Sequence, residues 1–211
     1  MIHLYSWGTP NGIKPIIMLE ELGTPYRLHG VDLSTGAQKQ ADFLSINPNG
    51  RIPAMIDTDR PGEARMGEVS GLGVFESGAI LLYLAETSGR FLPADPAARA
   101  DALGWTFWQV GGIGPMVGQL HWFEANDPDG AGVDRFAAEI VRLLDTMEGR
   151  LAGRAYLAGE YSIADMMCWA WTRAALDAIE GDWPAVGAWI ERIKARPAVT
   201  RAREKARELQ G

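Results

Sequence analysis

The groups best able to bind and ionise a thiol lie in one short segment near the N-terminus. Thr9 offers a hydroxyl and Asn11 an amide NH2, just before a predicted helix whose amino end carries a partial positive charge. A thiol with a reference pKa of ~8.5 needs roughly 2.7 kcal/mol of thiolate stabilisation for its pKa to fall by ~2 units, which two hydrogen bonds can supply. The segment can therefore hold an anion such as a thiolate without any basic side chain.

The thiol itself has to come from a bound molecule. The chain contains one cysteine, Cys168, so it can form neither an internal disulfide nor a CxxC redox pair. Cys168 lies in an apolar helical segment, and the usual role of such a residue is core packing.

Two residues just before Thr9 could instead donate a hydrogen bond to the thiolate. Tyr5 lies inside a predicted strand, where ring packing is the commoner role, whereas Ser6 could be either solvated or active. The three histidines (His3, His29 and His121) are scattered and lack ligand spacing to one another or to the cysteine, so we predict no metal site.

Two further segments have the pattern of a site for a small peptide. Pro53 enters a short apolar strand, where a cis Ile52–Pro53 bond would turn the Ile52 amide toward a ligand's main chain. Glu76 and Ser77 begin an amphipathic helix; the carboxylate suits an ammonium, and the hydroxyl with free N–H groups suits a carboxylate. Taken singly, each segment could be an ordinary turn or helix cap.

Alternating and helical patterns predict the elements that position these residues. The first half reads as a βαβ unit followed by a ββα unit, with residues 58–71 forming an elongated hairpin loop. The second half reads as helical, with one long helix over 97–123 that bends at its glycine cluster and a capping box from Ser162 to Asp165. Strands are predicted at 2–6, 26–31, 54–57 and 73–75, and helices at 12–22, 41–45, from 77, and at 133–151, 163–179, 184–195 and 197–209.

Composition limits the function classes. The chain has 211 residues, 47% hydrophobic and 22% charged, enough for two domains. We place them at 1–88 and 97–211, joined by a linker. A formal charge of -7 argues against nucleic-acid and anionic-membrane partners. The longest apolar block, 79–85, is too short to span a bilayer, so we expect a cytoplasmic protein.

In this order and spacing, the N-terminal segments resemble the cytosolic glutathione transferases. The resemblance covers essentially the whole chain and is greatest to the Nu class, in particular to the bacterial glutathione-dependent disulfide-bond reductases. It rests on the Thr-Pro-Asn-Gly run with Lys14, on Gln38, on Ile52–Pro53 and on residues 105–116. Trp7, Gly8 and Ile13 depart from the subgroup pattern and affect the substrate pocket more than the thiol site.

The resemblance implies an α+β thioredoxin-like N-terminal domain and an all-α C-terminal domain. It also implies a homodimeric enzyme that reduces small disulfides with two glutathione molecules or with bound glutathione disulfide, and that has weak transferase and peroxidase activity. Carried over by position, Thr9 and Asn11 contact the thiol, Gln38 holds the glycine carboxylate, Ile52 and Pro53 present the main chain, and Glu76 with Ser77 bind the γ-glutamyl end. Arg51 is a further contact, and Arg135 reaches glutathione from the dimer partner.

Two other functions stay open at this stage. A conjugating glutathione transferase would place an electrophile beside the same thiolate. A non-catalytic glutathione-binding regulatory module would bind the tripeptide without turnover, although the two donors in the Thr9–Asn11 segment argue against it.

Overall fold

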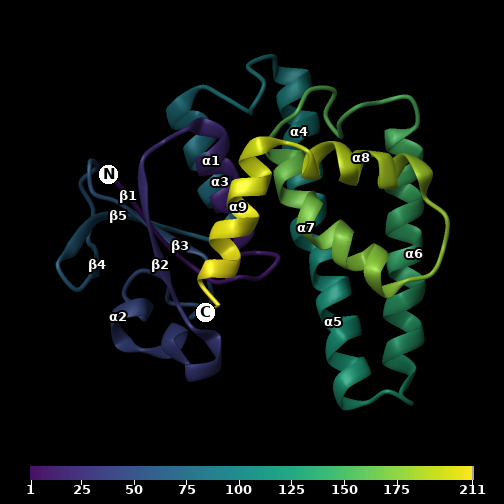
Figure 1. Ribbon diagram of the computed structural model, residues 1–211, viewed down its shortest axis with the longest axis horizontal. Coiled ribbons are helices and arrows are strands. Elements are labelled where there is room, and N and C mark those ends of the chain that lie inside the picture. Colours follow the sequence, from purple (N-terminus) through teal and green to yellow (C-terminus); the bar gives the residue numbers. More distant parts are fainter. Residues whose placement is uncertain (211) are drawn as a thin grey trace. The chain divides into compact units, whose positions relative to one another are not determined.

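The computed structural model describes residues 1–210, and these form two compact units (Figure 1). The first unit contains residues 1–90 together with the last helix, α9 (Pro197–Glu208). The second contains residues 91–196. The sequence-based range 97–211 follows chain order, whereas grouping by contacts assigns α9 to the first unit.

A five-stranded mixed sheet organises the first unit, with the strand order β2-β1-β3-β5-β4. β1 (Ile2–Ser6) pairs in parallel with β2 (Tyr26–Gly30) and antiparallel with β3 (Ala54–Asp57). β5 (Val69–Phe75) joins β3 and β4 (Ala64–Met66), both antiparallel. This is the predicted βαβ-ββα arrangement of a thioredoxin-like domain.

The hairpin of β4 and β5 corrects one prediction. Residues 58–71 were predicted to be a loop, but they contain all of β4 and the start of β5. The strands meet at a tight turn in which Gly67 has φ 61, a left-handed conformation that glycine adopts without strain. A three-residue strand is too short to show the alternation on which the sequence prediction depends.

Helices cover both faces of this sheet. On one face, Phe43 of α2 (Ala41–Leu44) and the following Ile46 pack against Tyr5 and Ala54. On the other face lie α1 (Ile13–Leu22) and α3 (Ser77–Ser88), and α3 contacts β3 and β5. Two short 3-10 turns, Leu33–Thr35 and Ala37–Lys39, lead into α2.

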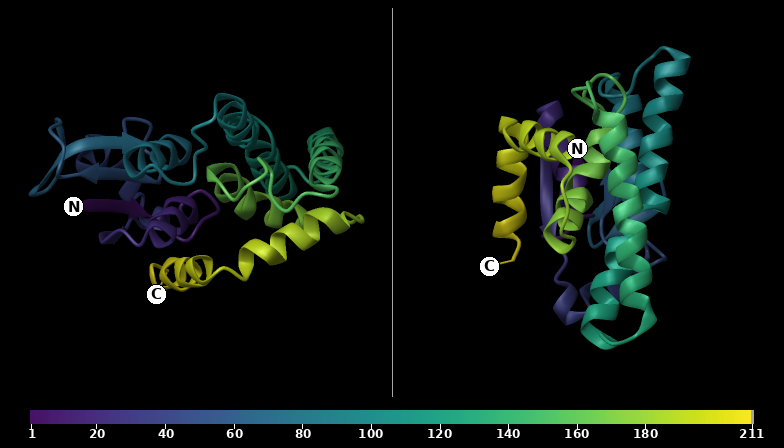
Figure 2. Two further views of the ribbon diagram at one scale, coloured as in Figure 1. Left: turned by 90° about the horizontal axis from the view of Figure 1, so that it is seen from above. Right: turned by 90° about the vertical axis from the view of Figure 1, so that its right-hand side faces the viewer.

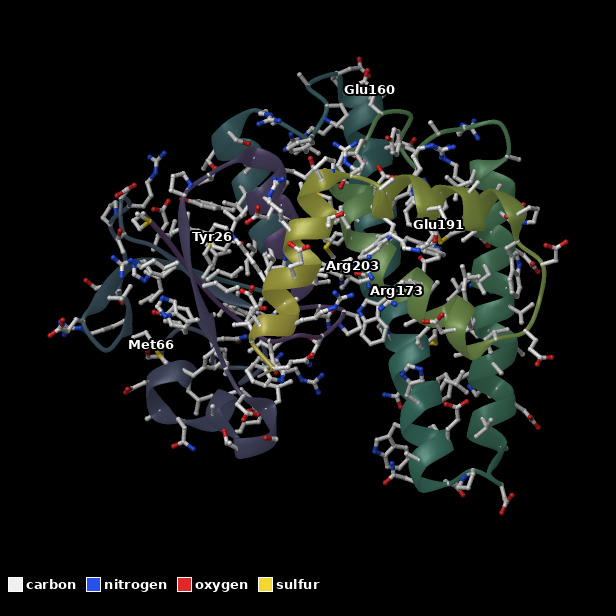
Figure 3. The ribbon with its side chains drawn as sticks, in the orientation of Figure 1. Tyr26, Met66, Glu160, Arg173, Glu191 and Arg203 are labelled. Atoms are coloured by element: carbon white, nitrogen blue, oxygen red, sulfur yellow. The ribbon has the colours of Figure 1, made fainter. Side chains whose placement is uncertain are left out.

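The last helix packs along α1, and both views of Figure 2 show α9 at the margin of the first unit. Glu20 on α1 accepts hydrogen bonds from Arg201 (2.7 Å) and Lys205 (2.5 Å) on α9. The hydroxyl of Tyr26, labelled in Figure 3, donates to the same carboxylate at 2.9 Å. Gln210 Nε2 donates to the carbonyl of Gly8 at 3.1 Å, so residues near both ends of the described chain meet at the loop between β1 and α1.

A stack of rings lies along β1 and β2. His3 Nδ1 lies 3.0 Å from His29 Nε2, and the two imidazoles stack at 5.2 Å between centroids. Tyr5 stacks on His29 at 4.6 Å. Burial, followed by the neighbouring positive charges, lowers the pKa of both histidines.

The second unit is helical, as predicted, and consists of α4 (Pro96–Gly111), α5 (Ile113–Asn126), α6 (Ala131–Leu151), α7 (Ile163–Ala178) and α8 (Pro184–Lys194). The prediction of one long helix over 97–123 was wrong, because the chain breaks at Gly112 between α4 and α5. A Cβ at Gly112 would lie 2.6 Å from the Trp108 carbonyl oxygen, so the break needs a residue without a side chain.

Asp165 organises the core of the second unit. It completes the predicted capping box with Ser162 at the start of α7, and it is fully buried. It also accepts hydrogen bonds from the Leu157 amide at 3.0 Å and the Trp189 indole at 2.8 Å. Cys168, three residues after Asp165 on α7 and 0% exposed, is a core residue as predicted. Within residues 1–210, no helix is long and apolar enough to cross a bilayer.

Candidate functional site

The β1–α1 loop folds tightly around the predicted thiol donors. The Thr9 carbonyl accepts the amide of Ile13 at 3.0 Å, and its hydroxyl accepts the amide of Gly12 at 3.1 Å. Ser6 is fully buried and donates to the Gly12 carbonyl at 2.9 Å, so its role is to hold the loop and the solvated alternative was wrong. A Cβ on Gly12 would lie 2.0 Å from the Trp7 carbonyl oxygen, which explains glycine at this position.

Asn11 connects this loop to a buried lysine. Lys14, one turn further along the chain, is 1% exposed, and its ammonium donates to Asn11 Oδ1 at 2.9 Å. Tyr5 is 3% exposed and packs in the core beneath the sheet, which confirms its predicted role. Burial raises the pKa of the Tyr5 phenol, which therefore stays neutral.

The second part of the site is the turn before β3. The Ile52–Pro53 bond is cis, as predicted. Asn47, which is 1% exposed, holds this turn from inside: its Nδ2 donates to the Arg51 carbonyl at 2.5 Å, and its Oδ1 accepts the Asn49 amide at 3.0 Å. The conformation of the turn is therefore specified by a buried amide.

The third part is the start of α3. Glu76 precedes the helix with φ 71, an unusual conformation for a residue with a side chain. The carbonyl of Glu76 accepts the Ile80 amide at 2.9 Å, while Ser77 is 7% exposed in the first turn. Strain of this kind is concentrated at functional sites, and here it places a carboxylate beside the amino end of a helix.

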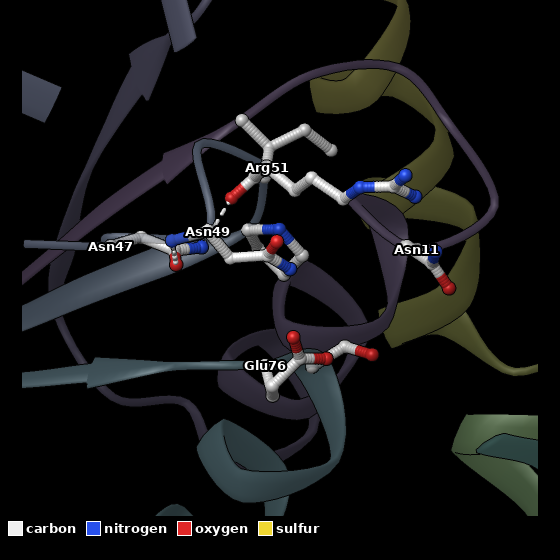
Figure 4. Close-up of a pocket in the computed structure, with 8 residues that line it drawn as sticks. Asn11, Asn47, Asn49, Arg51 and Glu76 are labelled. Atoms are coloured by element: carbon white, nitrogen blue, oxygen red, sulfur yellow. Dashed lines mark hydrogen bonds between the residues drawn. The ribbon is translucent and has the colours of Figure 1, made fainter. Parts of the chain in front are cut away.

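These parts enclose one pocket of about 290 Å³ (Figure 4). The close-up shows Asn47 and Asn49 on one side and Asn11 on the other, with Arg51 and Glu76 between them. Six predicted site residues line the pocket, namely Asn11, Arg51, Ile52, Pro53, Glu76 and Ser77. Their individual roles stay predictions, but segments separated by up to 66 positions in the sequence form a single cavity.

Three predicted residues are outside the pocket lining. Thr9 lies in the loop that carries Asn11. Gln38 lies beside the cis-proline turn, since its carbonyl oxygen would be 3.1 Å from a Cβ on Gly50. The side-chain Oε1 of Gln38 is buried and has no hydrogen-bond partner among residues 1–210. Arg135 is on α6, in the second unit.

Sequence reasoning missed Asn47 and Asn49 as site residues, although both line the pocket. The Asn-Pro-Asn-Gly run before Arg51 could have indicated them, because asparagine side chains commonly bond the backbone of a turn. Within residues 1–210, no group of three or more His, Cys, Asp or Glu side chains is close enough to hold a metal ion.

The arrangement suits a small zwitterionic ligand. The Glu76 carboxylate and the amino end of α3 lie at one cavity with the cis Ile52–Pro53 turn, and these two groups complement an ammonium and a carboxylate. Asn11 lies at the same cavity, across from Asn47 and Asn49.

Comparison with known proteins gives two family-model matches. A model described as the glutathione S-transferase N-terminal domain matches residues 1–86, and one described as the glutathione S-transferase C-terminal domain matches residues 130–192.

Among curated proteins, the chain is similar to the disulfide-bond oxidoreductase YfcG of Escherichia coli, with 47% identity over 98% of this chain and 96% of the relative. It is also similar to the disulfide-bond oxidoreductase YghU of the same bacterium, with 38% identity over 96% of this chain and 74% of that one.

Two solved structures are close in fold. A glutathione transferase from Burkholderia graminis, with two glutathione molecules bound per subunit, matches with a TM-score of 0.88 and 42% identity over 96% of this chain and 87% of the other. One from Pseudomonas putida, with one glutathione disulfide bound per subunit, matches with a TM-score of 0.89 and 39% identity over 96% and 90%.

Proposed function

Because this chain belongs to the glutathione S-transferase family, we propose that it is a glutathione-dependent disulfide-bond oxidoreductase. The observation that carries the proposal is the single cavity that joins Asn11, the cis Ile52–Pro53 turn and the Glu76–Ser77 helix start. The relatives named as disulfide-bond oxidoreductases and the neighbours that hold glutathione or its disulfide support it.

The proposed reaction is thiol–disulfide exchange with sulfur supplied only by glutathione and substrate. A glutathione thiolate attacks one sulfur of a small disulfide, forms a mixed disulfide and releases the other sulfur as a thiolate. A second glutathione thiolate then attacks the glutathione sulfur of the mixed disulfide and releases the second substrate thiolate. In total, one substrate disulfide and two glutathione molecules give two substrate thiols and one glutathione disulfide.

The protein contributes binding and thiolate stabilisation. In this proposal Thr9 and Asn11 donate to the sulfur, Glu76 and Ser77 hold the γ-glutamyl group, Ile52 pairs with the main chain beside Pro53, and Arg51 and Gln38 bind the far carboxylate. Gln38 would bind the carboxylate through its Nε2 donors, and its buried Oε1, which has no partner among residues 1–210, would accept from a ligand N–H or a water. Cys168 takes no part, since it is fully buried in the second unit.

Turnover of hydroxyethyl disulfide with glutathione, measured beside conjugation of a chloronitrobenzene, tests the reaction class. We expect the disulfide to be the better substrate, with conjugation and peroxide reduction weak. Asn11→Ala should lower disulfide turnover by about 10- to 100-fold, the effect of losing one hydrogen bond to a charged group. Asn126→Ala, on α5 in the second unit, is the matched control and should leave the rate unchanged. Faster conjugation than reduction would favour the transferase alternative, and binding without any turnover would favour a regulatory module.

We also propose a homodimer in which Arg135 contributes to the partner's site. Phe107 and Val110 on α4 are 63% and 45% exposed, and Trp122 on α5 is 54% exposed. Phe107 and Val110 are three positions apart and therefore share one face of α4, and contiguous exposed apolar surface is typical of interaction sites. Sedimentation of wild type and of Phe107→Glu tests the assembly, and glutathione affinity of Arg135→Ala tests the shared contact.

The proposed compartment is the cytoplasm, where a reducing glutathione pool is available.

A further inference from the structure

Lys14 is buried at a position where an apolar side chain would be expected. It is 1% exposed on α1 and is followed by the apolar core residues Pro15 to Leu19. Taking an ammonium out of water costs several kcal/mol unless its protons are well used. A lysine retained here therefore calls for a function that methionine or leucine could not supply.

The contact of Lys14 with Asn11 fixes the orientation of an amide. Lys14 Nζ lies 2.9 Å from Asn11 Oδ1. A lysine ammonium has donors and no acceptor, so the atom that faces it must be the amide oxygen and not the NH2. The NH2 group, with its two donors, is thereby directed to the other end of the amide. Asn11 lines the pocket, and Lys14 is not among the lining residues.

The remainder of the loop is already fixed. Gly12 donates its amide to the Thr9 hydroxyl and accepts from the buried Ser6 hydroxyl. These bonds hold the backbone on both sides of Asn11, and the Lys14 ammonium holds the oxygen of its side-chain amide.

Resting on the function proposed above, we infer that Lys14 is a positioning residue for thiol ionisation. It holds the Asn11 NH2 toward the glutathione sulfur, and its charge on the amide oxygen polarises the N–H groups so that they donate more strongly to a thiolate. The thiol proton leaves to solvent, and Lys14 keeps its own protons. The positive charge thus acts on the sulfur through a neutral amide and stays out of contact with the substrate.

Ultraviolet titration of bound glutathione measures this effect directly. Lys14→Met keeps the side-chain length and removes the charge. We expect the pKa of the bound thiol to rise by about one unit, which is about a tenfold loss of thiolate well below that pKa. Affinity for S-methylglutathione, which has no thiol proton, should change by less than about twofold. Lys194→Met, at an exposed ion pair on α8, is the matched control.

A double-mutant cycle separates positioning from a direct field. In an Asn11→Ala background, Lys14→Met should hardly move the thiol pKa, because the group that relays the charge is gone. An equal shift in both backgrounds would overturn the positioning role. An unchanged thiol pKa in Lys14→Met alone would overturn the inference while leaving the proposed reaction intact. Failure of the wild-type protein to bind glutathione or to lower its thiol pKa would overturn both.

A second variant leaves Lys14 untouched and guards against misfolding of Lys14→Met. Asn11→Asp keeps an oxygen for the Lys14 ammonium but replaces the NH2 donors with negative charge. We expect a folded protein whose bound thiol has a higher pKa than in Asn11→Ala, because a carboxylate repels the thiolate. A thiol pKa in Asn11→Asp as low as in wild type would show that the Asn11 NH2 is not the donor, and the inference would fall.

Discussion

The two units use buried polar groups in opposite ways. In the second unit, Asp165 is fully buried and its carboxylate accepts donors from the backbone and from Trp189, so its bonding capacity is used inside the fold. In the first unit, Asn11 and Ser77 have polar atoms at a cavity, and Glu76 stands in an unfavourable backbone conformation beside it. Burial of a polar group therefore indicates a site only when some of its hydrogen-bonding capacity faces open space.

The largest expected effect is a loss of stability in the second unit. Asp165→Ala should lower the free energy of unfolding by about 3–5 kcal/mol, because several buried donors lose their acceptor together. Denaturant titration measures it. Asp165→Asn keeps one acceptor oxygen and should cost roughly half as much. If Asp165→Ala is as stable as wild type, the carboxylate does not organise this core.

The next largest effect is expected at Glu76, whose backbone conformation in the first unit is strained. Glu76→Gly should lower glutathione affinity about tenfold, because the carboxylate that pairs with the ligand ammonium is lost. Stability should hold or rise, by at most about 1 kcal/mol, since glycine adopts φ 71 without strain. Calorimetry and thermal unfolding measure the two quantities. Glu76→Ala should lower glutathione affinity to the same extent but should not raise stability. If Glu76→Ala and Glu76→Gly are equally stable, the backbone conformation at this position is not strained.

A smaller effect concerns the His3–His29 pair, which is in the first unit but does not line the pocket. Burial lowers both pKa values in the folded state, so the unfolded chain binds more protons as the pH falls below about 6.5. Stability is therefore full above that pH and decreases as the pH falls toward the folded-state pKa values. Denaturation at several pH values should show this slope, and His29→Gln should flatten it. An unaltered slope in His29→Gln would place its origin elsewhere.

The smallest effect is expected at the C-terminal end of the first unit. Gln210→Ala should cost about 0.5 kcal/mol, the value of one exposed hydrogen bond to the Gly8 carbonyl. Gln119→Ala, on exposed surface in the second unit, is the control. A loss of several kcal/mol in Gln210→Ala would mean that the segment after α9 contributes more to this unit than its one hydrogen bond indicates.

Elements with strong periodicity or local chemistry could be predicted from the sequence. The Ser162–Asp165 capping box and the cis Ile52–Pro53 bond are specified by a few neighbouring residues, and both predictions were confirmed. The position of the break was not predictable, because four helix-weakening residues lie close together, namely Gly111, Gly112, Gly114 and Pro115. Only the close approach of the Trp108 carbonyl shows that the break is at Gly112. β4 was missed because pairing with β5, and not local pattern, makes it a strand.

Some residues of the candidate site could likewise be predicted from the sequence, and others could not. Asn11, Glu76 and Ser77 could be proposed from their residue types and their places before helices. Asn47 and Lys14 act through contacts inside the fold, with the Arg51 carbonyl and the Asn11 amide, and such pairings depend on side-chain direction that spacing alone does not give.

The placement of α9 affects the order in which the protein can mature on the ribosome. Strands β1 to β5 are translated first, yet α9, which bonds Glu20, and Gln210, which bonds the Gly8 carbonyl, are translated only after all of residues 91–196. A nascent chain that stops before Pro197 would carry every residue of the pocket lining and still lack one support of its thiol loop. Synthesis of the helical unit thus precedes final assembly of the domain that began the chain.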